Sequence, residues 1–137
     1  NSVDAVESKM FRRVRGLGVT MSEARIIQIV GDETFHTDRQ ISVSQIATEA
    51  MVRIPSMTAG VNRLVDRGFL TKERDESDGR RVNVTLTRKG EEVYRLHTIF
   101  HMRMAAAIME GMSLEDMEKF HAGIERLAAF YRAEEEK

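Results

Sequence analysis

The sequence predicts a mainly α-helical protein with a small β-wing, and three observations within residues 42–90 lead to this class. Two short segments carry apolar residues at helical spacing and are separated by residues 51–53 alone. Two strand-like stretches follow, the second with clear alternation of polar and apolar residues. The loop between them is rich in turn-forming residues and ends in arginine. Helix, turn, helix and hairpin in this order make a winged helix-turn-helix, with long helices expected at both ends of the chain.

The first helix of this unit is predicted from Ser42 to Ala50. The Ser42 hydroxyl can accept a hydrogen bond from the amide of Gln45, whose side chain can reach back to the amide of Ser42, which is the spacing of a capping box. The apolar residues that follow at helical spacing should face the core: Val43, Ile46, Ala47 and Ala50.

A second helix should begin near Ile54, because Pro55 lacks an amide donor and is tolerated in the first turn of a helix. Its inward side is formed by Met57, Val61 and Leu64. The outward side is small and polar: Ser56, Thr58, Ala59, Asn62 and Arg63. Hydroxyl groups near a helix N-terminus suit phosphates and base edges. The alternative is that Ser56 and Thr58 only cap a solvated helix.

The hairpin is predicted to follow Gly68, which stands where a left-handed residue ends the helix. An extended run leads to Arg74, and the return strand alternates Val82, Val84 and Leu86 with Arg81, Asn83 and Thr85. Arg80 and Arg81 come directly after the turn-rich tip. A guanidinium at such a tip can enter the narrow, electronegative minor groove of DNA, and Asp78 could hold Arg80 in place. The alternative is a solvated, charged tip.

These residues carry a resemblance to a known family. The matching segments are Ile46-Ala47, Pro55-Ser-Met-Thr58, Asn62-Arg63-Leu64, Gly68-Phe69, Asp78-Gly-Arg80 and Leu86-Thr-Arg-Lys-Gly90. In these residues and their spacing the chain resembles the multiple-antibiotic-resistance regulator (MarR) family. The resemblance implies a homodimeric transcriptional regulator, usually a repressor that a small ligand releases from its operator.

The chain departs from that family pattern at two positions. Ala59 stands where members often carry an arginine, so a base or phosphate contact is lost and the target sequence is expected to be unusual. Gly60 follows inside the helix, where glycine costs roughly 1 kcal/mol relative to alanine. With the segment from Ile54 to Thr58, these two residues are similar to the branch of the family that represses fatty-acid synthesis.

Charge is unevenly distributed along a chain whose net charge is −1. Residues 51–90 hold nine Lys and Arg against five Asp and Glu, whereas residues 110–137 hold four against eight. A chain that is basic on one segment can still displace counterions from DNA, and a dimer doubles that surface.

The flanking segments are predicted to be helical. Thr20 and Glu23 make another capping box, residues 31–34 suggest a loop, a long helix follows Gly90, and Ser113 opens the last helix. We expect a single domain, 1–137, in which residues 20–90 form the DNA-binding lobe. Residues 1–18 and 91–137 would form a dimerisation lobe, since a lone protomer would leave their apolar stripes in water. Packing within one chain is the alternative.

The sequence therefore predicts binding of double-stranded DNA, at a pseudo-palindromic operator, by a homodimer. The predicted DNA-binding residues are Ser44, Pro55, Ser56, Thr58, Asn62, Arg63, Arg80 and Arg81. A small-molecule effector of unidentified chemistry is expected between the long helices. The residues predicted to line its pocket are Met10, Val14, Ile27, His97, Phe100 and His101.

His97 and His101 stand four residues apart, a spacing that places two imidazoles on one helix face as zinc requires. The preferred interpretation is a structural or pocket-lining pair, with no metal and no resident cofactor. A zinc-responsive regulator is the alternative, with further ligands from Asp32, Glu33 or His36.

Composition excludes other classes. Without cysteine there is no disulfide or thiolate site, and no apolar run approaches the roughly 18 residues of a membrane span. No signal peptide is visible, so a soluble, cytoplasmic protein without a membrane partner is expected. No phosphate loop or nucleophile elbow is present, so we expect no enzyme. A winged fold that binds protein rather than DNA is a further alternative.

Overall fold

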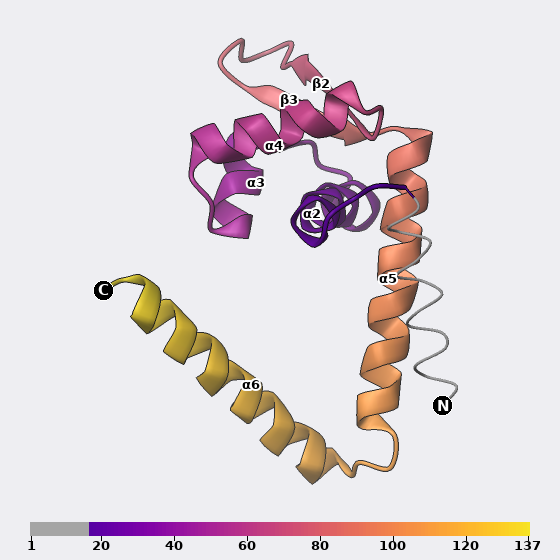
Figure 1. The fold of residues 1–137 in the computed structure, drawn as a ribbon, viewed down its shortest axis with the longest axis vertical. Helices are drawn as coiled ribbons and strands as arrows, with labels where there is room; N and C mark the ends of the chain where they lie inside the picture. Colours follow the sequence, from indigo (N-terminus) through magenta and orange to yellow (C-terminus); the bar gives the residue numbers. More distant parts are fainter. Residues whose placement is uncertain (1–16) are drawn as a thin grey trace. The chain divides into compact units, whose positions relative to one another are not determined.

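The computed structural model describes residues 17–137, shown as a coloured ribbon in Figure 1. The described residues up to His101 form one compact unit, and Met102–Lys137 form a second. The first unit contains the predicted helix-turn-helix and hairpin. The predicted helix over residues 1–18 lies almost wholly outside the described residues.

Helix α2, Met21–Thr37, opens with the predicted capping box, in which the Glu23 amide donates to Thr20 Oγ1 at 3.2 Å. The loop predicted over residues 31–34 is wrong, because α2 runs through it. A Cβ at Gly31 would lie 2.2 Å from Cδ2 of the Tyr94 ring. The glycine therefore permits close packing of α2 on the Tyr94 ring and does not break the helix.

The helix-turn-helix follows the prediction closely. Strand β1, Ile41–Ser42, leads into α3, Val43–Ala50, whose capping box joins Ser42 and Gln45. Met51 closes α3 with a left-handed φ of 58°. Helix α4, Ile54–Asp66, has Pro55 in its first turn. Of the residues predicted to face inward, Ile46, Ala47, Met57, Val61 and Leu64 are buried. Val43 and Ala50 are only half-buried and pack against the edge of the core.

Gly60 lies on the buried side of α4. A Cβ there would lie 3.1 Å from Cδ1 of Ile26, on α2. The glycine that the sequence marks as costly in a helix thus allows α4 to approach α2 closely.

The hairpin consists of β2, Leu70–Arg74, and β3, Val82–Leu86. The sheet is antiparallel in the order β1-β3-β2, so β3 lies between the other two strands. The predicted alternation along β3 holds only in part, because Asn83 on its polar side is just 5% exposed. The side-chain amide of Asn83 donates hydrogen bonds to Gln40 and Asp75, which lie outside β3. An alternating pattern of polar and apolar residues does not reveal such partners.

The core of the first unit gathers apolar side chains from α2, α3, α4 and the hairpin. Its largest fully buried members are Phe69, Ile27, Ile46, Leu64 and Leu70. Helix α5, Arg88–Met109, was predicted to follow Gly90 and begins three residues earlier, so that Gly90 lies within its first turn. Near its start, α5 contributes the buried residues Val93, Tyr94 and His97.

The second unit contains α6, Leu114–Glu135, which opens at Ser113 as predicted, with a capping box between Ser113 and Asp116. The apolar side chains of α6 are strongly exposed: Leu114, Phe120, Ile124, Leu127, Phe130 and Tyr131 range from 42% to 80%. Among the described residues, no helix has both the length and the hydropathy that crossing a bilayer requires.

Candidate nucleic-acid interface

One cleft of the first unit brings together side chains that the sequence singles out separately. It holds about 230 Å³ and is lined by Ser42, Val43, Ser44, Ile54, Thr58, Asn62, Lys72, Arg80, Arg81 and Val82. These residues come from the start of α3, from α4 and from the hairpin. The lining includes three cations and no carboxylate, so the cleft suits a polyanion. Five predicted DNA-binding residues lie here: Ser44, Thr58, Asn62, Arg80 and Arg81.

The other predicted residues, Pro55, Ser56 and Arg63, are exposed on α4 outside the cleft lining. The N-cap of α4 is Arg53, and no side chain caps this helix. The interpretation of Ser56 and Thr58 as simple capping residues is therefore wrong. Their hydroxyls stay available at a helix start where the backbone amides favour anions.

Lys72, on β2, lines the cleft although it was not among the predicted site residues. Its ammonium group donates a hydrogen bond to Oδ1 of Asn62, on α4. The sequence offered a weak signal, since Lys72 is one cation in an exposed, strand-like run. Its pairing with Asn62 depends on how β2 packs beside α4, which residue spacing does not specify.

The tip of the wing is organised around Asp75. Its Oδ2 accepts hydrogen bonds from Ser77 Oγ at 2.7 Å, from the Ser77 amide at 3.1 Å and from the Asp78 amide at 3.0 Å. The bonds from Ser77, Asn83 and Asp78 lower the pKa of the Asp75 carboxyl from its ordinary 3.8 to about 2. The turn is therefore fixed by a carboxylate that remains ionised.

Arg80 follows this turn, and its backbone amide donates to Asp78 Oδ1 at 3.0 Å. Asp78 thus holds Arg80 through the backbone. Within the part of the chain that the structure describes, the Arg80 guanidinium has no hydrogen bond or ion pair, and the side chain is exposed. Arg81 differs, because it is half-buried and its guanidinium bonds to Gln40, Gln45 and Asn83.

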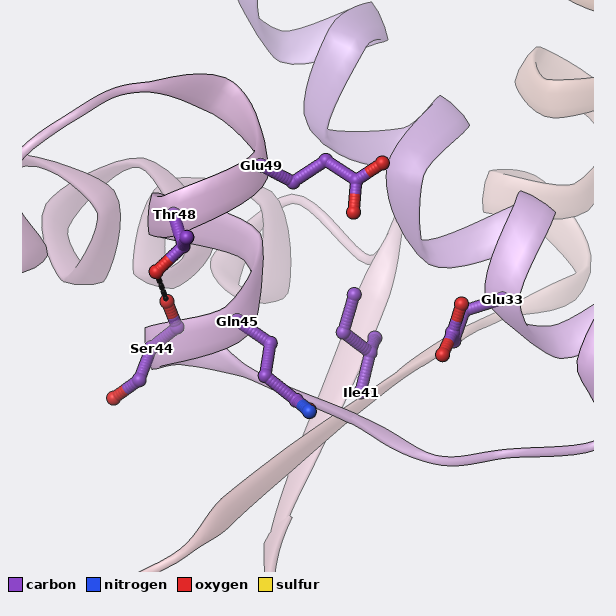
Figure 2. Close-up of a pocket in the computed structure, with 6 residues that line it drawn as sticks. All are labelled: Glu33, Ile41, Ser44, Gln45, Thr48 and Glu49. Atoms are coloured by element: carbon purple, nitrogen blue, oxygen red, sulfur yellow. Dashed lines mark hydrogen bonds between the residues drawn. The ribbon is translucent and has the colours of Figure 1, made fainter.

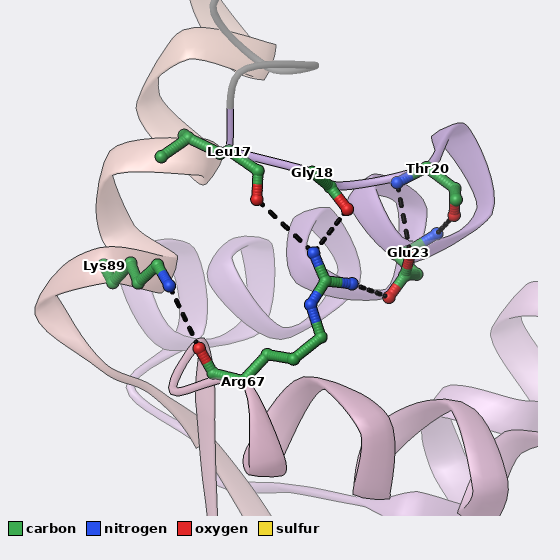
Figure 3. Close-up of polar contacts among 6 residues, drawn as sticks. All are labelled: Leu17, Gly18, Thr20, Glu23, Arg67 and Lys89. Atoms are coloured by element: carbon green, nitrogen blue, oxygen red, sulfur yellow. Dashed lines mark hydrogen bonds and ion pairs between the residues drawn. The ribbon is translucent and has the colours of Figure 1, made fainter.

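Six of the nine cations counted between residues 51 and 90 lie outside the cleft lining, and two of these six, Arg67 and Lys89, bond within the fold. Figure 3 shows Arg67 reaching from the end of α4 to the segment before α2. Its Nη1 donates to Glu23 Oε2 at 2.8 Å, and its Nη2 donates to the carbonyl groups of Leu17 and Gly18. Lys89 donates to the carbonyl of Arg67 at 3.1 Å and lies over the Phe69 ring. Arg67 and Lys89 therefore stabilise the fold. A count of charged residues along the sequence cannot distinguish such cations from those that are free to bind DNA.

Glu23, the partner of Arg67, is only 7% exposed. Burial raises the pKa of its carboxyl, but the hydrogen bonds from Thr20 and the charge of Arg67 outweigh burial, so the pKa lies below its ordinary value. The ion pair joins the start of α2 to the end of α4, and thereby helps to fix the orientation of α4.

A second pocket, of about 360 Å³, lies on another side of α3 (Figure 2). It is lined by Glu33, Ile41, Ser44, Gln45, Thr48 and Glu49. Two carboxylates and no cation line it, so it does not suit nucleic acid. The cleft next to α4 and the wing is therefore lined by positive charge, whereas this second pocket beside α3 is lined by negative charge.

The predicted effector pocket is only partly described. Met10 and Val14 lie outside the described residues. Ile27 is fully buried in the core, and Phe100 is half-buried with its ring edge-to-face against His101, with ring centroids 5.8 Å apart.

The Nε2 atoms of His97 and His101 lie 3.2 Å apart. His97 is 8% exposed, and among the described residues its Nδ1 has no hydrogen-bond partner. Burial is the main cause that lowers the pKa of His97, and electrostatic interactions with His101 and Arg25 lower it further against the opposing effect of Asp32. The pair therefore favours a neutral imidazole at His97.

The further zinc ligands proposed from the sequence make other contacts. Asp32 accepts a hydrogen bond from Tyr94 Oη at 2.9 Å, and His36 Nε2 lies 3.5 Å from the same hydroxyl. Glu33 lines the pocket of Figure 2. Residues 17–137 contain no group of three or more His, Cys, Asp or Glu side chains placed to hold a metal ion.

A helix-turn-helix whose second helix and hairpin share one basic cleft defines a winged-helix DNA-binding transcriptional regulator. The MarR family model matches residues 19–82. Streptococcus pneumoniae FabT, solved in complex with DNA, is 30% identical, with 84% of this chain and 77% of FabT covered at a TM-score of 0.72. The chain belongs to the MarR family.

More distant structures share the fold. MepR of S. aureus, solved as a DNA complex, is 17% identical at a TM-score of 0.71, with 90% of this chain and 86% of MepR covered. The regulator SlyA is 18% identical at a TM-score of 0.71, with 96% of this chain and 89% of SlyA covered. A search of curated proteins gave no match.

Proposed function

We propose that this protein is a transcriptional repressor that binds a pseudo-palindromic operator as a homodimer and releases it when a small molecule binds. The observation that carries the proposal is the cleft between α3, α4 and the wing, which is lined by cations and neutral polar groups without a carboxylate. The relative FabT, 30% identical, was solved with DNA, which supports the same partner here.

Each element has a distinct part in this mechanism. Helix α4 would enter the major groove, where Thr58 and Asn62 face base edges. Ser44, Ser56 and Arg63 would bind phosphates and fix the position of α4 along the duplex. Pro55 starts the helix so that its first turn faces the groove. Arg80, exposed and unpaired among the described residues, would enter the flanking minor groove.

Dimerisation is supported by the exposed apolar side of α6. Side chains such as Ile124 and Leu127, 48% and 56% exposed, would be covered by a second copy of the chain. A twofold dimer presents two α4 helices, so the half-sites should be about one DNA turn, roughly 34–36 Å, apart. Leu127→Glu should convert the dimer to monomer in sedimentation analysis, whereas Arg126→Glu on the same helix should not. A dimer that survives Leu127→Glu would exclude this face.

An effector can release the operator only if it binds one conformation of the dimer more tightly than another, and the two conformations differ in the distance between the α4 helices. The region of His97, Phe100 and His101 on α5 is our candidate site for that ligand. Because His97 is buried with an unpartnered Nδ1, a neutral ligand with a hydrogen-bonding group would suit it.

A zinc-responsive regulator is the second candidate, and the 3.2 Å separation of the two Nε2 atoms favours it, since one metal ion can bind two nitrogens so placed. Two further ligands would have to come from outside this pair. His101→Ala should then abolish zinc binding and make DNA affinity independent of zinc. Zinc-independent operator binding by the unmodified protein would exclude this candidate.

The proposal is tested by selecting duplexes from a random library with the purified protein and sequencing them. We expect a pseudo-palindrome with half-sites one turn apart. The selected sequence should then be sought upstream of the protein's own gene and of fatty-acid synthesis genes, the targets that the resemblance of residues 54–60 suggests. Selection of no common sequence would contradict a role as an operator-binding regulator.

A further inference from the structure

We propose that Arg81 is a positioning residue that joins the base of the wing to the helix-turn-helix and thereby sets where Arg80 meets DNA. This rests on the DNA binding proposed above and revises the sequence-based assignment of Arg81 as a DNA contact. Arg80 and Arg81 are neighbours in sequence, yet one is exposed and unpaired in the described structure and the other is half-buried and bonded.

The Arg81 guanidinium makes three hydrogen bonds within the protein. Its Nε donates to Asn83 Oδ1 at 2.8 Å. Its Nη2 donates to the carbonyl of Gln40 at 2.7 Å and to Gln45 Oε1 at 2.9 Å. A guanidinium has five N–H protons in a fixed planar arrangement, so most of them are committed to one geometry. Only Nη1 retains free protons.

These bonds anchor the wing to the start of α3. The Gln45 oxygen that receives Arg81 also accepts the Ser42 amide at 3.0 Å, as part of the capping box of α3. One side-chain oxygen therefore fixes both the first turn of α3 and the base of the wing. Gln40, directly before β1, contributes its backbone carbonyl to the same arrangement.

From Arg81 the bonds continue to the tip. The buried Asn83 donates through Nδ2 to Asp75 Oδ1 at 2.8 Å. The Asp75 amide donates to the carbonyl of Arg81 at 2.8 Å, and its carboxylate holds Ser77 and Asp78. Asp78 in turn holds the amide of Arg80. An unbroken series of hydrogen bonds thus runs from the α3 capping box to Arg80.

Arg81→Lys separates positioning from charge, because lysine keeps the positive charge but cannot reproduce the planar, three-bond arrangement. Arg80→Lys is the matched control. In the DNA-free protein, Arg81→Lys should speed amide hydrogen exchange of residues 75–81 by roughly tenfold, corresponding to about 1.4 kcal/mol, while Arg80→Lys leaves it unchanged. Gln45→Glu gives Arg81 an anionic acceptor and should slow this exchange. Unchanged wing exchange in both Arg81→Lys and Gln45→Glu would overturn the proposal without reference to DNA.

A double-mutant cycle on the selected operator duplex tests the functional half. Arg81→Lys should weaken binding about as much as Arg80→Ala, roughly tenfold, and should add little when Arg80 is already alanine. This non-additivity is expected only if Arg81 acts through Arg80. Fully additive losses, or wild-type affinity in Arg81→Lys, would show that Arg81 serves as a charge on DNA. If the wild-type protein selected no operator, the proposed function would fail, and the exchange experiment would still decide the positioning role.

Discussion

The ammonium group of Lys72 donates a hydrogen bond to the side-chain oxygen of Asn62, so β2 restrains a polar residue of α4. An asparagine that reads adenine uses its oxygen as acceptor and its nitrogen as donor together. With Lys72 at the oxygen, the two side chains present mainly donors to the cleft. Guanine, which offers the acceptors O6 and N7, is therefore the expected base at this position.

Lys72→Met should free the Asn62 oxygen and shift the preferred base at one operator position from guanine toward adenine. Such a contact is worth about 1–3 kcal/mol of discrimination. The measurement is a comparison of duplexes that differ at that base pair. Lys89→Met removes the same charge outside the cleft and should leave the preference unchanged. An unaltered base preference in Lys72→Met would contradict the proposed reading.

Asp75 makes the wing resistant to acid. The pKa of its carboxyl is depressed from 3.8 to about 2 in the folded protein. Because the carboxyl pKa is lower in the folded than in the unfolded protein, ionised Asp75 stabilises the fold. This stabilisation is complete above the unfolded pKa and is lost as pH falls through the folded pKa. The Ser77 and Asp78 amide resonances should therefore titrate near pH 2 in NMR spectra, and the titration should vanish in Asp75→Asn. A midpoint near 3.8 would show that these bonds do not form in solution.

Two helical glycines should respond oppositely to alanine. At Gly31 the new Cβ would meet the buried Tyr94 ring at 2.2 Å, so Gly31→Ala should destabilise the protein by about 1–3 kcal/mol. At Gly123, on α6, nothing lies within 4 Å, so Gly123→Ala should stabilise by about 0.5–1 kcal/mol. Urea unfolding of the two variants measures both effects. Equal responses would contradict the close packing of α2 on Tyr94.

The Arg67–Glu23 pair should stabilise the first unit. Glu23→Gln keeps an acceptor for Thr20 but removes the charge, and should lower the free energy of unfolding by about 1 kcal/mol. Glu115→Gln is the matched control, because its pair with Lys119 is strongly exposed and worth about 0.3–0.5 kcal/mol. The Glu23 pKa is depressed, so the difference should be complete above the ordinary carboxyl pKa of 4.5 and decline as pH falls below it. A difference independent of pH would contradict the ion pair.

The secondary structure of residues 42–90 was predictable because local rules act there without competition. Ser42 with Gln45 marks the start of α3 by spacing alone, and Gly68 adopts the left-handed conformation that ends α4, with φ of 81°. Beyond this segment, Ser113 with Asp116 marks the start of α6 in the same way. The loop prediction for residues 31–34 failed because Gly31 is needed inside α2 for close packing on Tyr94, a residue distant in sequence.

The sequence predicted which types of residue line the cleft, but not which of these residues bond to one another. Thr58 and Asn62 follow from the outward side of α4, whereas the Lys72 contact needs the packing of β2 beside it. The roles of Arg80 and Arg81 cannot be separated by pattern, since both follow the same turn. The positions of Gln40 and Gln45 beside the base of the wing show that Arg81 is the one held.

The most direct test of the central claim is fluorescence anisotropy on the selected operator and on a scrambled duplex at two salt concentrations, with wild-type protein and Arg80→Ala. We predict tight, sequence-selective binding by the wild type that weakens steeply with salt. Arg80→Ala should bind both duplexes more weakly and with a shallower salt dependence. Binding that ignores sequence, or no salt-dependent binding at all, would contradict the claim and favour a winged fold that binds protein.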